Sequence, residues 1–293
     1  MRWQGMYKGL CFYSHFGNGD LFNSREIIKD IIKFGIADRY WYAHSKNPNM
    51  FNDIPELTHI KVHKFLSAMD QYKVGGANDL YINTWIGRDG RYVLPGIGCT
   101  LKMYKGMFNE TLSNLELPTL TKKMSEYIPT IDYEKFNIES TKVWIDHYIK
   151  YKIVLISTGN VQSNQAINFD FTPVVKNLCE KFPKVIFVIT SKLDLDYTNL
   201  FFSSNITGNG FDLNEISYLS LFADTIIGRS SGPYVFTQVK ENLMNPDKKF
   251  MAFTKHINSS NLVRGISTKA HLLWSDATEE NEVTERCVEA IEI

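Results

Sequence analysis

Short apolar runs alternate along this chain with longer stretches in which apolar residues recur at helical spacing. In the first third, the runs that predict strands cover residues 9–14, 39–43, 59–63 and 79–85. The first run is followed by a stretch with Ile28, Ile31 and Ile32 on one face, which predicts a helix that ends at Gly35. Strands separated by helices or loops favour a parallel, doubly wound sheet.

The same alternation begins again after the middle of the chain. Residues 98–128 are expected to be helical in two pieces, broken before Pro118, and residues 129–140 to connect two domains. Further helices are expected at 140–150, 172–181 and 277–291, and strands at 152–157, 185–189, 225–227, 250–253 and 271–274. The sequence therefore predicts an α/β protein with two facing Rossmann-like domains, residues 1–139 and 140–293, built on mostly parallel sheets.

The composition of the 293 residues is that of an ordinary globular protein, and the formal net charge is zero. A general nucleic-acid binder is not expected, because such proteins usually carry a basic excess. Any anionic ligand must therefore be held by a local site. The aromatic fraction of 13% is high, which fits aromatic platforms for sugars, although a tyrosine-rich core is the commoner cause.

Four widely spaced cysteines form no Cys-x-x-Cys pair, which argues against a zinc site and favours a reducing, cytoplasmic compartment. The first residues lack the continuous apolar core of a signal peptide. No run approaches the roughly 18 uninterrupted apolar residues of a transmembrane helix. Peripheral contact with a membrane stays open.

One stretch, residues 205–240, combines a helix, a buried strand and a polar turn. Asp212 and Glu215 have the spacing of a capping box at the start of the helix. The β-branched run 225–227 ends at Gly228, and a second helix is expected to open near residues 231–233. Such a turn offers free backbone amides and a positive helix end to a phosphate. The alternative is an ordinary α/β loop with helix-capping serines.

A second candidate is the turn Gly17-Asn18-Gly19-Asp20, which follows the first strand and opens a helix. Its spacing differs from the dinucleotide-binding fingerprint, so it is a weak indication of a redox cofactor. From the residues alone, this is a Gly-rich turn with Asp20 as the N-cap of the helix. His15 lies beside this turn, where a structural histidine is commoner than a functional one.

Together the two motifs resemble those of the heptosyltransferase-like glycosyltransferases. That family opens with an apolar strand, Gly-x-Gly-Asp and a helix, and carries a Gly-x-[Asp/Ser]-[Ser/Thr]-Gly-Pro turn in its C-terminal segment. The resemblance covers about residues 1–35 and 205–240, with only the strand–helix rhythm between them. It implies two domains of the GT-B type and an inverting sugar transfer. Asp20 would be the general base, with His15 as a second candidate that contacts donor phosphate or acceptor.

The resemblance also places the diphosphate of a nucleotide-sugar donor against the second turn. The donor-binding candidates are Gly19, Ser157, Thr158, Gly159, Lys192, Arg229, Ser230, Ser231 and Gly232. The sequence departs from the family at two points, because the loop 161–165 has no lysine or arginine and Ser230 stands where many members carry aspartate. Arg229 is a candidate substitute, since a guanidinium matches phosphate oxygens, and a surface salt bridge is its alternative role.

No metal ligand is assigned. Asp194-Leu195-Asp196 matches the Asp-x-Asp pattern of metal-dependent glycosyltransferases, but a match of this length is a poor signal. We expect a metal-independent reaction without a cofactor, in which helix dipole and amides stabilise the departing diphosphate. The expected partners are the nucleotide-sugar donor and a glycan or lipid-linked acceptor. A non-catalytic nucleotide- or glycan-binding protein and a nucleotide-sugar epimerase are the alternatives.

Overall fold

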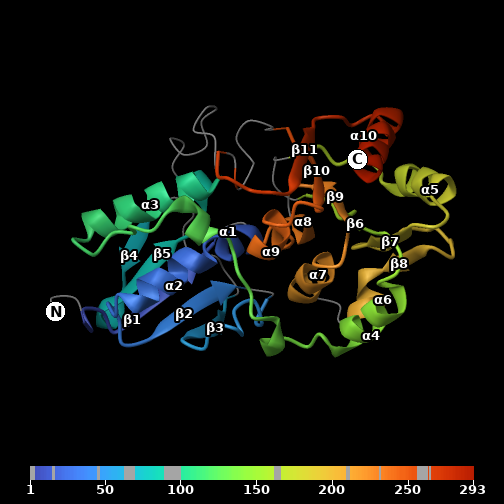
Figure 1. Cartoon of the computed structure of the whole chain (residues 1–293). Helices are drawn as coiled ribbons and strands as arrows, with labels where there is room; N and C mark the ends of the chain where they lie inside the picture. Colours follow the sequence, from blue (N-terminus) through green and yellow to red (C-terminus); the bar gives the residue numbers. More distant parts are fainter. Residues whose placement is uncertain are drawn as a thin grey trace. The chain divides into compact units, whose positions relative to one another are not determined.

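The computed structural model describes residues 4–14, 17–44, 47–62, 70–88, 100–161, 166–208, 212–230, 232–255, 263 and 265–293. The chain divides into two compact units. Unit 1 comprises Met1–Lys135 and Asn261–Ser267, and unit 2 comprises Phe136–Ser260 and Thr268–Ile293. Each unit is built on one β-sheet (Figure 1).

The sheet of unit 1 has the strand order β3-β2-β1-β5-β4. Its four parallel strands match the expected runs and are β1 (Gly9–Tyr13), β2 (Tyr40–His44), β3 (Leu57–Lys61) and β5 (Asp79–Asn83). The sequence did not predict β4 (Tyr72–Val74), which is antiparallel to β5 and too short for a recognisable alternation. The chain leaves β1 for β2 and β3 on one side and returns to β5 on the other, so the strand order switches between β1 and β5.

Two helices, α1 (Asn18–Asn23) and α2 (Arg25–Lys33), occupy the stretch after β1 and confirm the helix expected there. The helical stretch ends where predicted, because Gly35 adopts a φ of 65°, a left-handed conformation that glycine takes without strain. The short 3₁₀ turns η1 (Gly76–Asn78) and η2 (Ile86–Arg88) flank β5.

The stretch 98–128 is only partly helical. Its first part is α3 (Thr100–Asn114), as expected, but the second helical piece is wrong, since the chain there forms only the short turn η4 (Met124–Tyr127). A further short turn, η5 (Tyr133–Lys135), follows. The reason lies in α3, whose Asn109 side chain accepts from the amide of Leu120 at 2.7 Å and donates to its carbonyl at 3.3 Å. Part of the backbone pairing that a helix would supply thus comes from a neighbouring element.

The sheet of unit 2 is wholly parallel, with the order β11-β10-β9-β6-β7-β8. Its strands are β6 (Ile153–Ser157), β7 (Ile186–Ile189), β8 (Leu200–Phe202), β9 (Thr225–Arg229), β10 (Lys249–Phe253) and β11 (His271–Ser275). All except the short β8 were predicted. The strands run outward from β6 to β8 and then from β9 to β11 on the other side, which is the Rossmann order with its switch between β6 and β9.

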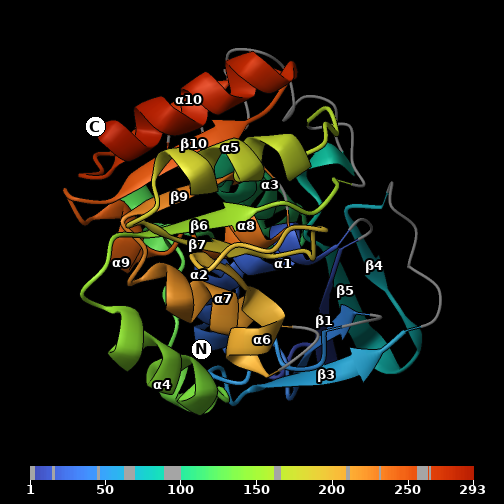
Figure 2. The ribbon, with the colours of Figure 1, turned by 90° about the vertical axis from the view of Figure 1, so that its right-hand side faces the viewer.

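Helices cover both faces of this sheet. α5 (Thr172–Lys181) and α10 (Glu280–Glu292) lie side by side over one face (Figure 2). On the other face α8 (Pro233–Phe236) contacts β6 and β9 and packs against α7 (Leu213–Ser220). The remaining helices are α4 (Glu139–Tyr148), α6 (Ser203–Thr207) and α9 (Lys240–Leu243).

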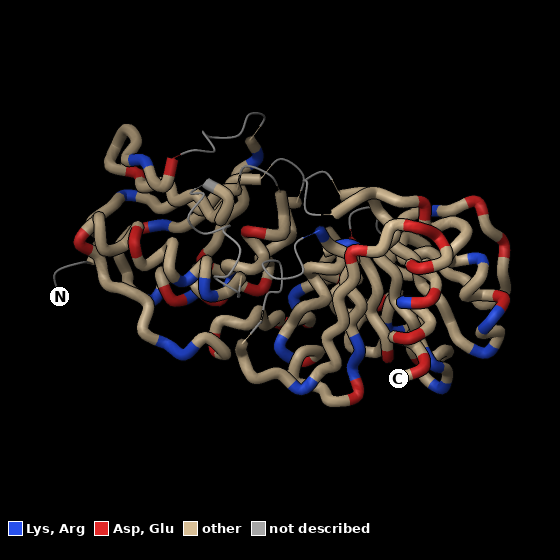
Figure 3. Tube along the Cα trace, turned by 90° about the horizontal axis from the view of Figure 1, so that it is seen from above, with Lys and Arg blue, Asp and Glu red and all other residues tan. Residues whose placement is uncertain are grey.

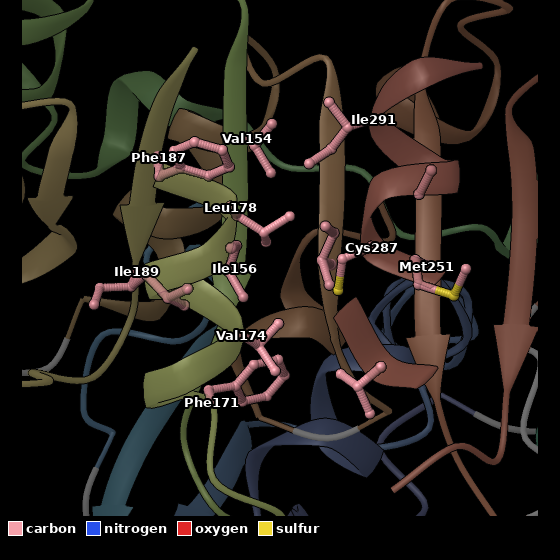
Figure 4. Close-up of a cluster of buried hydrophobic side chains, with 14 of the residues drawn as sticks. Val154, Ile156, Phe171, Val174, Leu178, Phe187, Ile189, Met251, Cys287 and Ile291 are labelled. Atoms are coloured by element: carbon pink, nitrogen blue, oxygen red, sulfur yellow. The ribbon is translucent and has the colours of Figure 1, made fainter. Parts of the chain in front are cut away.

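The core between the first of these faces and its two helices is apolar (Figure 4). Alternate residues of each strand point into it and meet the helices; the labelled members are Val154, Ile156, Phe171, Val174, Leu178, Phe187, Ile189, Met251, Cys287 and Ile291. The strand residues that point to the other face of the sheet, such as Leu155 and Ile226, are equally buried. Burial on both faces is what a parallel sheet requires, and it explains the uninterrupted apolar runs of the sequence.

The α/β fold class with two mostly parallel sheets is confirmed. The capping box before α7 is wrong. Asp212 precedes that helix, but its side chain makes no capping hydrogen bond and instead accepts one from the Thr207 hydroxyl at 3.0 Å.

Charge is spread evenly over the chain. Figure 3 shows acidic and basic residues interspersed along both units, in keeping with the net charge of zero. Among the helices described, none is both long enough and apolar enough to cross a membrane.

Candidate functional site

The candidate donor residues lie at the carboxyl edge of the sheet in unit 2. β6 ends at Ser157 and β9 ends at Arg229, and these two strands are parallel neighbours that flank the switch in strand order. In open α/β sheets the crevice at such a switch is where ligands bind, because the connections on either side diverge from it. The topology therefore brings together two segments that the sequence analysis selected separately.

The segment after β6 is fastened to the segment after β7. The Thr158 hydroxyl donates to the carbonyl of Ser191 at 3.2 Å and accepts from the Ser191 amide at 3.0 Å. The amide of Thr158 donates to the Thr190 hydroxyl at 3.2 Å. Thr158 is thus already occupied by structural hydrogen bonds, and its backbone is held in a fixed position at the edge of the sheet.

Ser157 differs from its neighbour. Its side chain is buried, and its hydroxyl has no hydrogen-bond partner among the described residues. A buried hydroxyl without a partner is costly, and a bound water molecule would satisfy it. Gly159 follows it, and a side chain at that position would approach the Ser191 hydroxyl to 3.1 Å.

The turn after β9 is compact. A Cβ at Gly228 would lie 2.6 Å from the Cβ of Ser157, so glycine is required for β6 and β9 to approach here. Ser230 is buried and its amide donates to Phe253 at 3.2 Å. Gly232 has a φ of 53°, in the left-handed region that favours glycine. Ser231 lies outside the described residues.

The helix expected after this turn begins at Pro233 and ends at Phe236. A single turn of helix sums few peptide dipoles, so it provides a weaker positive end than the sequence analysis assumed. The Ser230 amide is already bonded to Phe253 and Pro233 has no N–H, so among the described residues of the turn Gly232 has the backbone amide that could hold a phosphate.

Arg229 has a role that neither alternative anticipated. Its side chain is 1% exposed, which rules out a surface salt bridge. The guanidinium donates to the carbonyls of Thr158 and Gly159, both at 3.0 Å, and to that of Ile167 at 3.3 Å. It also donates to the carbonyl of Phe169 and lies against the rings of Phe169 and Phe171.

Four of its five N–H groups are therefore used within the protein. Burial lowers the pKa of Arg229 to about 10, opposed by the charge of Asp170, so the group stays protonated at neutral pH. The residue holds the loop after β6 in place, and direct contact with a diphosphate is a secondary role at most.

Lys192 follows β7 at the same edge of the sheet and is exposed. Within the described part of the chain its ammonium group has no ion-pair partner. It is the basic side chain among the candidates that is free to meet an anion. Asp194 and Asp196 lie in the exposed loop beyond it, and the described residues contain no cluster of potential metal ligands.

The second group of candidates lies at the switch point of unit 1. Gly19 and Asp20 belong to α1, which begins at Asn18, so the N-cap role for Asp20 is wrong and Gly17 holds that position. The Asp20 carboxylate accepts a hydrogen bond from the Tyr104 hydroxyl on α3 at 2.5 Å. Burial raises the pKa of Asp20 to about 6, while hydrogen bonds from Tyr104 and from the backbone amide of Ile86 oppose the rise. His15 lies outside the described residues.

The sequence analysis missed the partners of Asp20. Tyr104 is 1% exposed, on a helix whose other buried residues are mostly apolar, so its pattern is that of a core aromatic. Ile86 contributes only its backbone, which no sequence motif reveals. Two surface grooves of unit 2, one lined by Trp144 and Tyr148 and one by Lys181 and Glu289, contain none of the candidate residues.

Comparison with known proteins identifies the fold. No protein-family model matches the sequence, and no curated protein is significantly similar to it. The chain is similar over 100% of its length to 98% of a glycosyl transferase of family 9 from Veillonella parvula DSM 2008, with a TM-score of 0.60 and 10% identity. It is similar over 97% of its length to 91% of the UDP-GlcNAc 2-epimerase from Neisseria meningitidis bound to UDP-GlcNAc, with a TM-score of 0.51 and 10% identity.

The fold is therefore that of the GT-B proteins, and the resemblance drawn from the two sequence motifs is confirmed at the level of the fold. At 10% identity the likeness says nothing of the reaction, and it includes a transferase and an epimerase alike. The residues at the two switch points must distinguish between them.

Proposed function

We propose that this protein is a glycosyltransferase that moves a sugar from a nucleotide-diphosphate-sugar to a hydroxyl acceptor, with inversion and without a metal. The proposal rests on one observation above all. Asp20, the residue that the motif selects as the base, is a carboxylate at a sheet switch point whose pKa lies close to neutral. A general base works best when its pKa is near the working pH, because it is then both ionised and basic.

The reaction would proceed by direct displacement at the anomeric carbon. Asp20 takes the proton from the acceptor hydroxyl as the hydroxyl oxygen bonds to that carbon. The bond from the same carbon to the diphosphate oxygen breaks, and the nucleoside diphosphate leaves with the electron pair. A single displacement inverts the configuration and needs one base and no covalent intermediate.

The donor would be held at the carboxyl edge of the sheet in unit 2. The exposed ammonium of Lys192 and the backbone amide of Gly232 are the available groups, and the hydroxyl of Ser157 is unpartnered but buried. Arg229 supports them through the loop that it holds. A donor of this class is in keeping with the epimerase of similar fold, which was solved with UDP-GlcNAc bound.

An epimerase is the second candidate, because a solved epimerase shares the fold. It would act on the same donor without an acceptor. The occupied guanidinium of Arg229 favours a third candidate, a non-catalytic binder, since it leaves the site with fewer free cations.

One experiment separates the three. The full chain is incubated with UDP-, GDP- and ADP-sugars, with and without glycan acceptors, and free nucleoside diphosphate and sugar stereochemistry are measured. A transferase releases nucleoside diphosphate, and acceptor accelerates the release. An epimerase yields the stereoisomer with the nucleotide still attached, and a binder gives thermal stabilisation alone.

The base is tested with Asp20→Asn. We expect turnover to fall at least a hundredfold, in the range typical of a lost general base, while nucleotide binding is retained. Asp30→Asn is the matched control, because it makes the same change at a buried aspartate of the next helix, paired with Lys122, and should leave turnover unchanged. Full turnover in Asp20→Asn would remove the base assignment.

A further inference from the structure

We propose that Tyr104 is a positioning residue for the base, because its hydroxyl donates to Asp20 and fixes both the orientation and the ionised form of that carboxylate. The catalytic meaning of this contact rests on the proposed function. The contact itself does not, since it joins a buried tyrosine and a half-buried aspartate of unit 1 whatever the reaction.

The geometry is that of a strong hydrogen bond. The Tyr104 oxygen lies 2.5 Å from Oδ1 of Asp20, within the range of a hydroxyl donating to a carboxylate. Tyr104 is carried by the fifteen-residue helix α3, in which it is almost fully buried, so its ring cannot turn away without disturbing the core. Asp20 is thereby tied to an element 84 residues further along the chain.

A third residue sets the direction of the hydroxyl proton. Burial and the charge of Asp20 raise the pKa of Tyr104, and a side-chain hydrogen bond donated by Asn23, on the same helix as Asp20, opposes that rise. The carbonyl oxygen of the Asn23 side chain has no partner among the described residues, which agrees with its amide being the group in contact. The Tyr104 hydroxyl carries one proton. Because its oxygen accepts the hydrogen bond from Asn23, that proton is directed at Asp20.

The chain of hydrogen bonds therefore runs from Asn23 through Tyr104 to Asp20, and it ends on an acceptor. Burial favours the protonated acid at Asp20, whereas this hydrogen bond favours the carboxylate. Among the described elements around Asp20, Tyr104 is the titratable side chain in contact with it, and η2 contributes the backbone amide of Ile86. Tyr104 thus decides how much of the base is ionised near neutral pH.

The test removes the hydroxyl and follows the carboxyl directly. In Tyr104→Phe the pKa of Asp20, measured by carbon NMR titration of the full chain and assigned with Asp20→Asn, should rise by about 1. Tyr42→Phe is the matched control, since it deletes another buried hydroxyl of unit 1, which donates to Pro48 at 2.7 Å, and should leave Asp20 unchanged. Asn23→Ala, which frees the hydroxyl to rotate, should produce a smaller rise in the same direction.

A turnover measurement tests whether the contact between Tyr104 and Asp20 matters for catalysis. The acidic limb of the pH–rate profile of Tyr104→Phe should move up by the same amount, so that turnover at pH 6 falls about fivefold through ionisation alone. An unchanged Asp20 pKa in both Tyr104→Phe and Asn23→Ala would overturn the inference. If every variant and the wild type lack transfer, the proposed function fails, and the NMR titration still decides the role of Tyr104.

Discussion

The folded protein partly removes the Asp20 carboxylate from water, although an ionised carboxylate is most stable when it is hydrated. Its ordinary pKa of 3.8 rises to about 6 in the folded protein, chiefly through burial. The folded state then binds the Asp20 proton more tightly than the unfolded chain does. The contribution of this group to stability is consequently greatest below pH 3.8 and is lost as the pH rises through 6.

This predicts that Asp20→Asn stabilises the protein while it removes activity. The uncharged amide avoids the desolvation of the carboxylate, so the free energy of unfolding at pH 8 should increase by about 1–3 kcal/mol. The gain should shrink as the pH is lowered from 8 towards 4. Urea denaturation across that range measures it, and a variant that is less stable at pH 8 would contradict the argument.

Arg229 shows the opposite case, because four of the five N–H groups of this buried cation are hydrogen-bonded within the protein. Replacing it by methionine would leave the carbonyls of Thr158, Gly159, Ile167 and Phe169 without their donor. We expect the free energy of unfolding to fall by about 3 kcal/mol or more, because buried acceptors lose their partner. Urea denaturation measures this change.

Lys192→Met is the companion change at the same sheet edge. Because Lys192 is exposed, its loss should alter stability by less than about 0.5 kcal/mol. The proposed donor contact would instead appear as weaker nucleotide binding. Equal stability of Arg229→Met and Lys192→Met would mean that Arg229 does not hold the loop.

At the scale of elements, the contact between β6 and β9 determines the shape of the donor edge. Gly228 lets the two strands approach, because any Cβ there would meet Ser157 at 2.6 Å. Gly228→Ala should therefore destabilise the protein by about 1–3 kcal/mol through overpacking. Gly76→Ala is the control, since a Cβ there meets nothing within 4 Å. Thermal denaturation of both variants, with and without nucleotide, distinguishes a general loss of stability from a loss at this edge.

The strand elements were predictable because burial on both faces leaves continuous apolar runs, as in Ile153–Ser157 and Thr225–Arg229. The strands that were not predicted, Tyr72–Val74 and Leu200–Phe202, are three residues long, which is too short to show the alternation of apolar and polar residues that marks a strand. The second helix of 98–128 failed for another reason, since the Asn109 side chain of α3 pairs with the backbone of Leu120. Such tertiary pairing overrides local propensity and leaves no local signal.

Among the candidate site residues, too, some could be predicted from the sequence and others could not. Asp20 was found because it sits in a short motif after a strand, and Ser157 and Arg229 because they end strands. The role of Arg229 was not predictable, since its carbonyl partners lie up to 71 residues away. Tyr104 was missed because a buried tyrosine on a helix looks the same in the sequence whether its hydroxyl meets a carbonyl or a carboxylate.

At the scale of the whole molecule, two sheets each carry a switch in strand order, between β1 and β5 and between β6 and β9. Every proposed donor contact except Gly19 belongs to unit 2. Asp20, Tyr104 and Asn23 belong to unit 1.

That separation has an evolutionary consequence. Under the proposed function, the residues that bind the nucleotide and those that set the pKa of Asp20 lie in different stretches of the chain, so one set could change in evolution while the other is kept. A descendant that selects another nucleotide could inherit its aspartate, tyrosine and asparagine untouched.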